Sequence, residues 1–434
     1  MSELAIGGIG MLVLFILIFL KLPVGICMAL VGLAGITYFA GFKAGLSSLG
    51  IVPYTTITSY ALAALPLFIV MGAFCHYGGV SEDLYYSTNQ ILGHQPGGLA
   101  MATVGACAGF AAVSASSLAT VATMGKVALP EMKKYKYSDS LATGSIAAGG
   151  SMGILIPPSG ILIIYGIIVE ESIGKLFIAG FIPGIMEAIF YMITIFIICR
   201  FNPLIGPAGA KTTFKQKILS IRSLWSVIIL FGLVLGGIYF GIFSPTEAAG
   251  IGACGALVIV FIKRRFSWQV LKASLIEAGS VTAMVLVLMI GAHILVNFLA
   301  MSNLPFELSA IISGLQINPY LIMAGIMVMY IILGCVMDAM SMILLTVPVL
   351  APIVIALDFN LIWFGIIVVR AVEIGAITPP FGINVFVMKN VAKDIPISTI
   401  YKGIVPFFIS DLVHVALLIA FPSIVLFLPE LMKG

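Results

Sequence analysis

Long apolar segments are the feature of this sequence that most restricts how it can fold. They recur along all 434 residues, and many approach or exceed the roughly 20 residues that an α-helix needs to cross a bilayer. Only 9% of the residues are charged, whereas a soluble domain of ordinary composition has about a quarter. In hydrocarbon a helix satisfies its backbone hydrogen bonds within one segment. The sequence therefore predicts an all-α polytopic membrane protein.

The first 200 residues contain five predicted spans and one pair of shorter helices. Each arm of the pair, at 98–113 and 117–131, is too short to cross a bilayer alone, and the turn between the arms is small and polar. Such a pair is typical of a re-entrant hairpin, which enters and leaves on one face. The polar stretch Gly78–Gly97 is interpreted as a connection. The predicted elements are scaffold helices at 4–78 (4–21, 24–42 and 59–78, with an amphipathic piece at 44–57), hairpin one at 98–131, a broken span at 138–170 and a span at 175–199.

The second half repeats this pattern at an offset of 222 residues. That spacing recurs in the proline pairs Pro23 and Pro245, Pro130 and Pro352, and Pro157 and Pro379. An internal duplication is the sequence signature of many transporter folds. A basic linker at 201–222 separates the halves. The second half is predicted to comprise scaffold helices at 223–301 with an amphipathic piece at 266–279, hairpin two at 318–355, a broken span at 361–388 and a span at 399–428, within 223–434.

The distribution of cations predicts the orientation. Each half has five spans and one hairpin, so the two halves must be inverted relative to each other. An outer N-terminus puts nearly all Lys and Arg of the loops on the inner side and leaves on the outer side only Lys43, Lys175 and Lys433. The positive-inside rule favours this arrangement. It predicts extracytoplasmic termini, with hairpin one on the cytoplasmic face and hairpin two on the outer face.

Two double prolines break otherwise apolar helices. One lies in Gly150–Gly160 and the other in Glu373–Gly382, and each follows a glycine, Gly153 or Gly375, by four residues. A double proline removes two backbone donors and breaks the helical hydrogen-bond ladder. In lipid such breaks persist only where protein or a water-filled cavity receives the freed polar groups. Two matched breaks therefore indicate a binding site.

Sodium suits the polar groups at the hairpin tips and the breaks. Hard cations take oxygen ligands, and unwound backbone beside small hydroxyls supplies them. One serine in an apolar helix is more often a packing residue, but a serine cluster at a tip favours function. Asp338, at the tip of hairpin two, either binds a coupling ion or caps the next helix, and both roles are compatible. The predicted ion ligands are Ser114, Ser116, Ser117, Gly150, Ser151, Gly153, Asp338, Gly375 and Thr378.

Residues around the breaks are the candidate substrate ligands. Arg370 and Glu373 lie one helical turn apart, so they either neutralise each other or leave Arg370 for an anionic substrate. Thr378 and Asn384 flank the second double proline and are better placed as polar ligands. The predicted substrate ligands are Pro158, Ser159, Arg370, Pro380 and Asn384.

Familiar catalytic motifs are absent from the sequence. It contains no Walker A motif, no HExxH and no GxSxG, which argues against a primary pump and against the common hydrolases. The six cysteines and four histidines are isolated from one another. Lys126 is expected to extend to the inner surface, and Glu247 to stabilise a helix N-terminus. We expect no enzyme, no cofactor, no metal other than sodium and no nucleic-acid partner.

These motifs together resemble the large membrane subunit of the tripartite ATP-independent periplasmic (TRAP) transporters over essentially the full length. The resemblance rests on Ser114-Ala-Ser-Ser, Gly153-Ile-Leu-Ile-Pro-Pro-Ser-Gly, Phe243-Ser-Pro-Thr-Glu-Ala-Ala, Gly334-Cys-Val-Met-Asp and Gly375-Ala-Ile-Thr-Pro-Pro-Phe-Gly. Ala115 departs from the family's usual glycine at the first tip, which should stiffen that turn. The resemblance implies an elevator-type, sodium-coupled importer of an organic acid (a carboxylate) in the bacterial inner membrane, with both termini periplasmic.

The resemblance also implies partners. A soluble periplasmic binding protein delivers the acid, and a separate small membrane subunit is expected because no such segment precedes Met1. Two alternatives stay open. One is a proton-coupled organic anion transporter of a different family, with Asp338 and Glu373 as proton carriers. The other is an ion channel, which would need a continuous polar lining.

Overall fold

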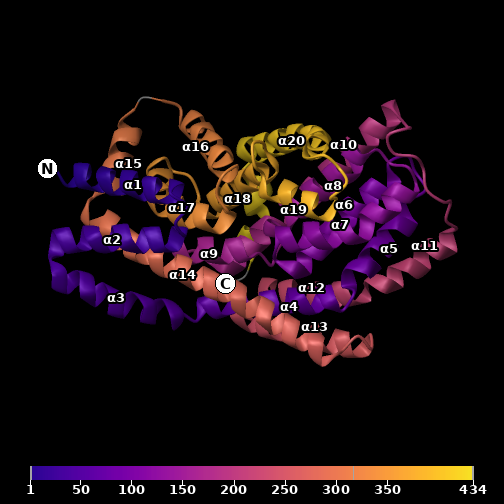
Figure 1. Ribbon diagram of the computed structural model, residues 1–434, viewed down its shortest axis with the longest axis horizontal. Helices are drawn as coiled ribbons and strands as arrows, with labels where there is room; N and C mark the ends of the chain where they lie inside the picture. Colours follow the sequence, from indigo (N-terminus) through magenta and orange to yellow (C-terminus); the bar gives the residue numbers. More distant parts are fainter. Residues whose placement is uncertain (1, 316, 433–434) are drawn as a thin grey trace.

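Every regular element in the described part of the chain, residues 2–315 and 317–432, is helical in the computed structural model (Figure 1). By length and composition, six of these helices can cross a membrane, or seven if one bent pair counts as a single span. The expectation of an all-α membrane protein is confirmed. Lys433, which the orientation argument places on the outer side, lies outside the described residues.

The first half contains ten α-helices among the described residues. Its α3 and α4 meet at a bend of 56°. A 3-10 turn at Met152–Ile154 follows α8, and the break continues to Ser159. The helices are α1 (Glu3–Phe19), α2 (Val24–Ala40), α3 (Phe42–Ile57), α4 (Ala64–Tyr77), α5 (Val80–Leu92), α6 (Gly98–Ser114), α7 (Ser117–Lys134), α8 (Asp139–Ser151), α9 (Gly160–Val169) and α10 (Ile173–Phe201).

The second half has a similar order of elements, with α11 and α21 in addition. Its α14 is one continuous helix of 34 residues, where an amphipathic piece at 266–279 and a separate span were expected. The helices are α11 (Phe214–Ile221), α12 (Trp225–Tyr239), α13 (Pro245–Ile262), α14 (Trp268–Met301), α15 (Leu304–Gly314), α16 (Pro319–Gly334), α17 (Ala339–Ala356), α18 (Leu361–Ile377), α19 (Ile383–Val391), α20 (Ile397–Ala420) and α21 (Ser423–Leu431).

Three stretches differ from the predictions because tertiary contacts and caps stabilise short helices. The supposed connection Gly78–Gly97 contains α5, whose buried Leu84 packs against Gly109 of α6. The linker at 201–222 contains α11, which begins at a capping box between Thr213 and Gln216. The predicted span at 399–428 divides into α20 and α21, because the chain leaves the helical conformation ahead of a proline.

The helices form two neighbouring groups. In one, α1 to α4 pack with α12, α13 and α14, and α2 runs along α14 (Figure 1). In the other, α6, α7 and α8 pack together, and α8 and α10 contact α20. The α6–α7 and α16–α17 pairs each turn back on themselves at a short polar tip. Of these elements, α6 and α9 contact the scaffold helix α4, and α17 contacts the scaffold helix α14.

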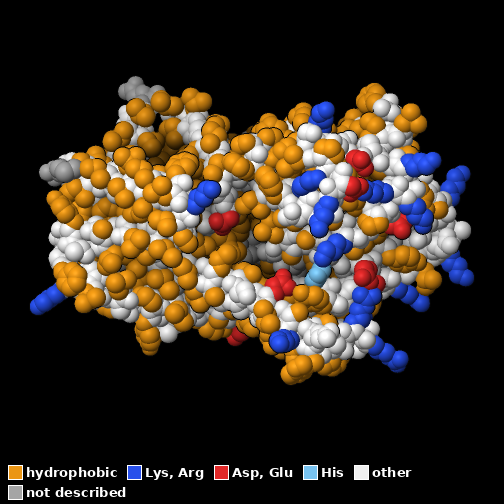
Figure 2. All heavy atoms as spheres, viewed as in Figure 1, with side chains coloured by type: hydrophobic (Ala, Val, Ile, Leu, Met, Phe, Trp, Pro, Cys, Tyr) orange, Lys and Arg blue, Asp and Glu red, His pale blue; other side chains and the backbone are white. Residues whose placement is uncertain are grey.

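Cations gather at one end of the molecule. Figure 2 shows most of the visible Lys and Arg at the right, the end where Figure 1 has α5 and α11, and hydrophobic side chains over much of the rest of this face. The exposed cations at helix ends and in the connecting segments include Lys133, Lys134, Lys136, Lys211, Lys215, Arg264 and Arg265. This clustering is the pattern on which the predicted orientation depends.

Glycine permits the closest crossing in the second group. Gly403 of α20 faces the backbone of α8, where a Cβ atom would lie only 1.9 Å from the Ser140 carbonyl oxygen. Gly144 lies on the opposite side of the same contact. Small residues of this kind let membrane helices approach closely and pack tightly. The contact joins the first broken span to the last long helix.

Replacing Gly403 with alanine is expected to destabilise the protein by about 2 kcal/mol or more, because α8 and α20 must move apart. Gly232→Ala is the matched control, since no atom lies within 4 Å of the Cβ position there and α12 is equally helical. Thermal unfolding in lipid nanodiscs measures both variants. Equal melting temperatures for the two would contradict the close-crossing argument.

Candidate functional site

The tip of hairpin one brings three oxygen atoms together. The hydroxyl groups of Ser114 and Thr120 lie 3.0 Å apart, and Thr120 donates to the Ser116 carbonyl at 2.8 Å. Ser116 also caps α7 by accepting from the Ala119 N–H at 3.3 Å. Between the two helices, Ala115 adopts a left-handed conformation with φ of 54°. The turn thus concentrates small hydroxyls and a carbonyl at the end of the hairpin.

The first break packs directly against this tip. A Cβ atom on Gly153 would lie 2.8 Å from the Ser116 carbonyl oxygen, so only glycine permits the contact. Gly150 packs in the same way against Val121 of α7. The Ser159 hydroxyl donates to the Ile154 carbonyl at 2.5 Å and accepts from the Leu162 N–H, which closes the break and starts α9.

The tip of hairpin two has the corresponding arrangement. Asp338 caps α17 by accepting from the Ser341 N–H at 3.0 Å, so the predicted capping role is confirmed. Gly334, at the end of α16, packs against Gly375 at the second break, where a Cβ atom on Gly375 would lie 2.7 Å from the Gly334 Cα. Each tip therefore meets one broken helix through glycine.

The second break leaves one amide without partners. Thr378 donates to the Ile374 carbonyl at 2.5 Å, and Tyr401 donates to the carbonyls of Pro380 and Phe381 at 2.9 and 2.6 Å. Asn384, in the first turn of α19, is fully buried, yet neither its amide oxygen nor its amide nitrogen has a hydrogen-bond partner. A buried amide without partners costs free energy unless a ligand or water completes it.

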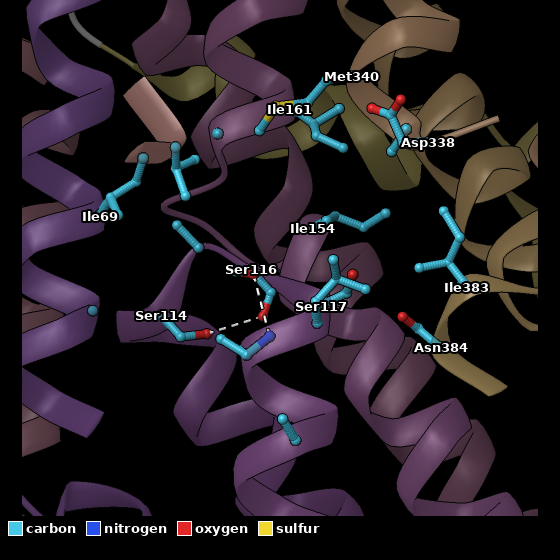
Figure 3. Close-up of a pocket in the computed structure, with 18 of the residues that line it drawn as sticks. Ile69, Ser114, Ser116, Ser117, Ile154, Ile161, Asp338, Met340, Ile383 and Asn384 are labelled. Atoms are coloured by element: carbon cyan, nitrogen blue, oxygen red, sulfur yellow. Dashed lines mark hydrogen bonds between the residues drawn. The ribbon is translucent and has the colours of Figure 1, made fainter. Parts of the chain in front are cut away.

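A cavity of about 590 Å³ lies between the two tips and the two breaks. In Figure 3, Ser114, Ser116 and Ser117 lie on one side and Asp338 and Met340 on another, and the Asn384 side chain points toward Ser117. Helices α4 and α14 close the cavity on the scaffold side. The predicted site residues that line it are Ser114, Ser116, Ser117, Asp338 and Asn384.

The other predicted site residues do not line the cavity. The hydroxyls of Ser151 and Ser159 are fully buried and donate to backbone carbonyls, as the Thr378 hydroxyl also does. Pro380 is exposed. The residues outside the cavity lining are Gly150, Ser151, Gly153, Pro158, Ser159, Arg370, Gly375, Thr378 and Pro380.

Arg370 is enclosed by carboxyl groups instead of facing the cavity. Its Nη1 contacts Glu373 and lies 2.6 Å from Glu187, while its Nη2 donates to Asp411 at 2.7 Å. The side chain is fully buried. The predicted pairing with Glu373 is therefore present, and we leave Arg370 out of the proposed substrate ligands.

Several residues of the cavity were not predicted. His76 and Glu277 come from α4 and α14, and Thr123 and Lys126 come from α7 beyond the tip. His76 shares a hydrogen bond of 2.9 Å with Thr123. The spacing of Thr120 and Thr123 after the tip serines, about one turn apart on α7, is a signal that could have extended the predicted set. No spacing connects His76 or Glu277 to the tips, since they join the site only through folding.

Comparison with known families decides the class of the protein. The family model described as "Tripartite ATP-independent periplasmic transporter, DctM component" matches residues 11–424. The chain belongs to this family. The resemblance inferred from the motifs is confirmed, and the protein is a multi-pass membrane protein of a transport family.

Two relatives and one solved structure illustrate the range of the family and of the fold. The chain is 35% identical over 385 residues to the C4-dicarboxylate TRAP transporter large permease protein DctM of Pseudomonas aeruginosa, covering 88% of this chain and 89% of that protein. It is 31% identical over 427 residues to the sialic acid TRAP transporter permease protein SiaT of Haemophilus influenzae, covering 98% and 68%. The crystal structure of the Alcanivorax borkumensis YdaH transporter matches with a TM-score of 0.62 at 15% identity, covering 87% of this chain and 89% of that one, which shows a shared fold alone.

Substituting Ala115 with glycine is expected to stabilise the protein slightly, by up to about 1 kcal/mol, because glycine lacks the Cβ that disfavours the left-handed conformation. Ala112→Gly is the control. Ala112 is a helical residue of α6 a few positions earlier, and glycine there should cost about 1 kcal/mol. Thermal unfolding of both variants tests the difference. A loss of stability in Ala115→Gly as large as that in Ala112→Gly would contradict a strained tip.

Proposed function

We propose that this protein is a sodium-coupled importer of an organic acid that works by an elevator type of alternating access. Membership of the TRAP family supports secondary transport. The names of the two relatives contain C4-dicarboxylate and sialic acid, and both compounds are carboxylates. The observation that carries the proposal is the cavity between two polar tips, because it joins candidate ion ligands to a buried amide without partners.

Sodium would bind where each tip meets its broken helix. At the first junction the Ser114 and Thr120 hydroxyls and the Ser116 carbonyl supply neutral oxygen ligands. At the second junction the Asp338 carboxylate, which lines the cavity, adds a negative charge that a bound cation would neutralise. Glycines at both contacts, Gly153 and Gly375, bring backbone close enough to share in the coordination.

The acid would bind in the cavity beside Asn384. The side-chain amide can donate to a carboxylate, and the Ser117 hydroxyl on the neighbouring tip offers a second donor. A volume of about 590 Å³ fits a small organic acid, within the roughly 300–1,000 Å³ typical of ligand pockets. A sodium ion on each side would compensate the charge of the substrate.

The repeat organisation supports the elevator mechanism. Matched tips and breaks recur at a spacing of 222 residues, as in Pro157 and Pro379, and the cation distribution favours opposite orientations for the halves. In this proposal the hairpins, the broken spans, α10 and α20 move together. The group formed by α1–α4 and α12–α14 stays fixed.

The proposed setting is the bacterial inner membrane with both termini in the periplasm. A periplasmic binding protein would release the acid above the cavity, and a small membrane subunit would pack on the apolar face of the fixed group. These partners follow from the family, whose description names a periplasmic tripartite transporter.

Uptake into proteoliposomes that contain the partner subunits tests the coupling. A sodium gradient alone is expected to drive accumulation of the acid supplied on its binding protein. Uptake that ignores sodium and follows a pH step would overturn sodium coupling and favour a proton-coupled carrier. A single-channel current would favour a channel.

Asn384→Ala is expected to reduce uptake at low substrate concentration by about tenfold, because a hydrogen bond to a charged group contributes about 1.5–3 kcal/mol. Asn202→Ala is the control, since Asn202 is exposed at the end of α10. Saturating substrate should restore much of the rate of the Asn384 variant. Unchanged concentration dependence would remove Asn384 from the substrate site.

Two substitutions of Asp338 separate its two roles. Asparagine keeps the helix cap and removes the charge, whereas alanine removes both and should cost about 1 kcal/mol of stability. If the charge binds sodium, both variants will require more sodium for half-maximal uptake, and only Asp338→Ala will melt earlier. Normal sodium dependence in Asp338→Asn would leave capping as the sole role.

A further inference from the structure

Three carboxyl groups surround a single guanidinium in the interior of the protein, away from the cavity. Glu187 lies on α10, Glu373 and Arg370 on α18, and Asp411 on α20. At most 1% of each side chain is exposed. Among the described residues, no other carboxylic side chain is buried. None of the four residues of the cluster lines the cavity.

The hydrogen bonds within this cluster are unequal. Asp411 Oδ1 accepts two, from Arg370 Nη2 at 2.7 Å and from the Tyr191 hydroxyl at 2.7 Å. Glu373 accepts one from Arg370 through Oε2, and its Oε1 has no partner. Glu187 Oε1 lies 2.6 Å from Arg370 Nη1, but neither Glu187 oxygen accepts a well-formed hydrogen bond.

The charges do not balance if all three carboxyl groups are ionised. Arginine stays protonated in proteins, so one positive charge would face three negative ones. Two other titratable groups face the cluster, the Tyr191 hydroxyl and the His414 imidazole, and in their neutral forms they add no positive charge. An uncompensated buried charge is strongly unfavourable, so a cluster with two excess negative charges is disfavoured. Two bound protons make it neutral.

The hydrogen bonds indicate where the protons lie. Asp411 is the carboxyl with two donors, which favours its ionised form as the partner of Arg370. Glu187 and Glu373 have oxygens without partners, and a proton turns such an oxygen into a donor. The imidazole of His414, one turn from Asp411 on α20, is buried, and neither of its nitrogens has a partner. One of these nitrogens can therefore accept a hydrogen bond.

We propose that Glu187 and Glu373 form a proton-binding site in which both are held as neutral carboxylic acids, while Arg370 and Asp411 form the ion pair. The site joins α10, α18 and α20 as a neutral clamp. Its protons stay bound during transport, since none of the residues of the cluster lines the cavity. The site does not depend on sodium coupling or on the identity of the substrate.

Infrared spectroscopy of the purified full-length protein in nanodiscs tests the proposal directly. A protonated carboxyl has a C=O stretch apart from the carboxylate bands, and the wild-type protein should show it at neutral pH. Glu187→Gln and Glu373→Gln should each remove part of the band, and Glu247→Gln, which alters an exposed helix cap, should leave it unchanged. A wild-type spectrum without the band, or a band insensitive to both variants, would overturn the site.

Protein stability provides a second readout. Glutamine imitates a neutral glutamic acid, so Glu187→Gln and Glu373→Gln should fold and melt near the wild-type temperature. Asp411→Asn should melt well below it, because Arg370 would lose its carboxylate. If all three carboxyl groups were ionised, the two glutamine variants would instead differ strongly from the wild type. The wild-type spectrum decides the question even if one variant fails to fold.

Discussion

Broken helices in a medium without water are the constraint on which the rest of this structure depends. A freed carbonyl there must find a donor from the protein. Ser159 supplies one to Ile154, Thr378 to Ile374, and Tyr401 to the carbonyls after the second break. Most polar side chains near the breaks therefore complete the backbone. Asn384 differs from them, because its side-chain amide has no hydrogen-bond partner among the described residues.

The breaks and tips could be predicted from sequence because their cause is local. Proline lacks an N–H wherever it stands, and the duplication repeats the effect at a fixed interval. Helix α5 was missed for the opposite reason. Its segment is polar on average, and only contacts with other helices, among them α6, α7 and α11, explain why Leu84 and Tyr85 are buried. The continuity of α14 could not be predicted from the sequence either. An amphipathic segment followed by an apolar segment does not indicate whether the helix bends between the two.

The residues of the candidate site likewise divide into those that the sequence predicts and those that join the site only through folding. The tip residues, such as Ser117 and Asp338, were predicted from the repeat, whereas His76 reaches the cavity only through tertiary packing. The partners of Arg370 beyond Glu373 were also unpredictable, because they come from distant helices. The first half has Ala148 and Ser151 at the positions equivalent to Arg370 and Glu373. The first broken span thus has no ionisable side chain at these two positions, and the two halves differ in electrostatics there although they share a backbone plan.

The length of α14 has a consequence for the surrounding bilayer. At about 1.5 Å per residue its 34 residues extend about 51 Å, well beyond a hydrocarbon layer of about 30 Å. A continuous helix of that length must tilt or extend beyond the hydrocarbon layer, and its tilt depends on the local thickness of the bilayer. The corresponding α3 and α4 avoid the mismatch by bending through 56°. A change in lipid chain length therefore acts on one half of this protein more than on the other.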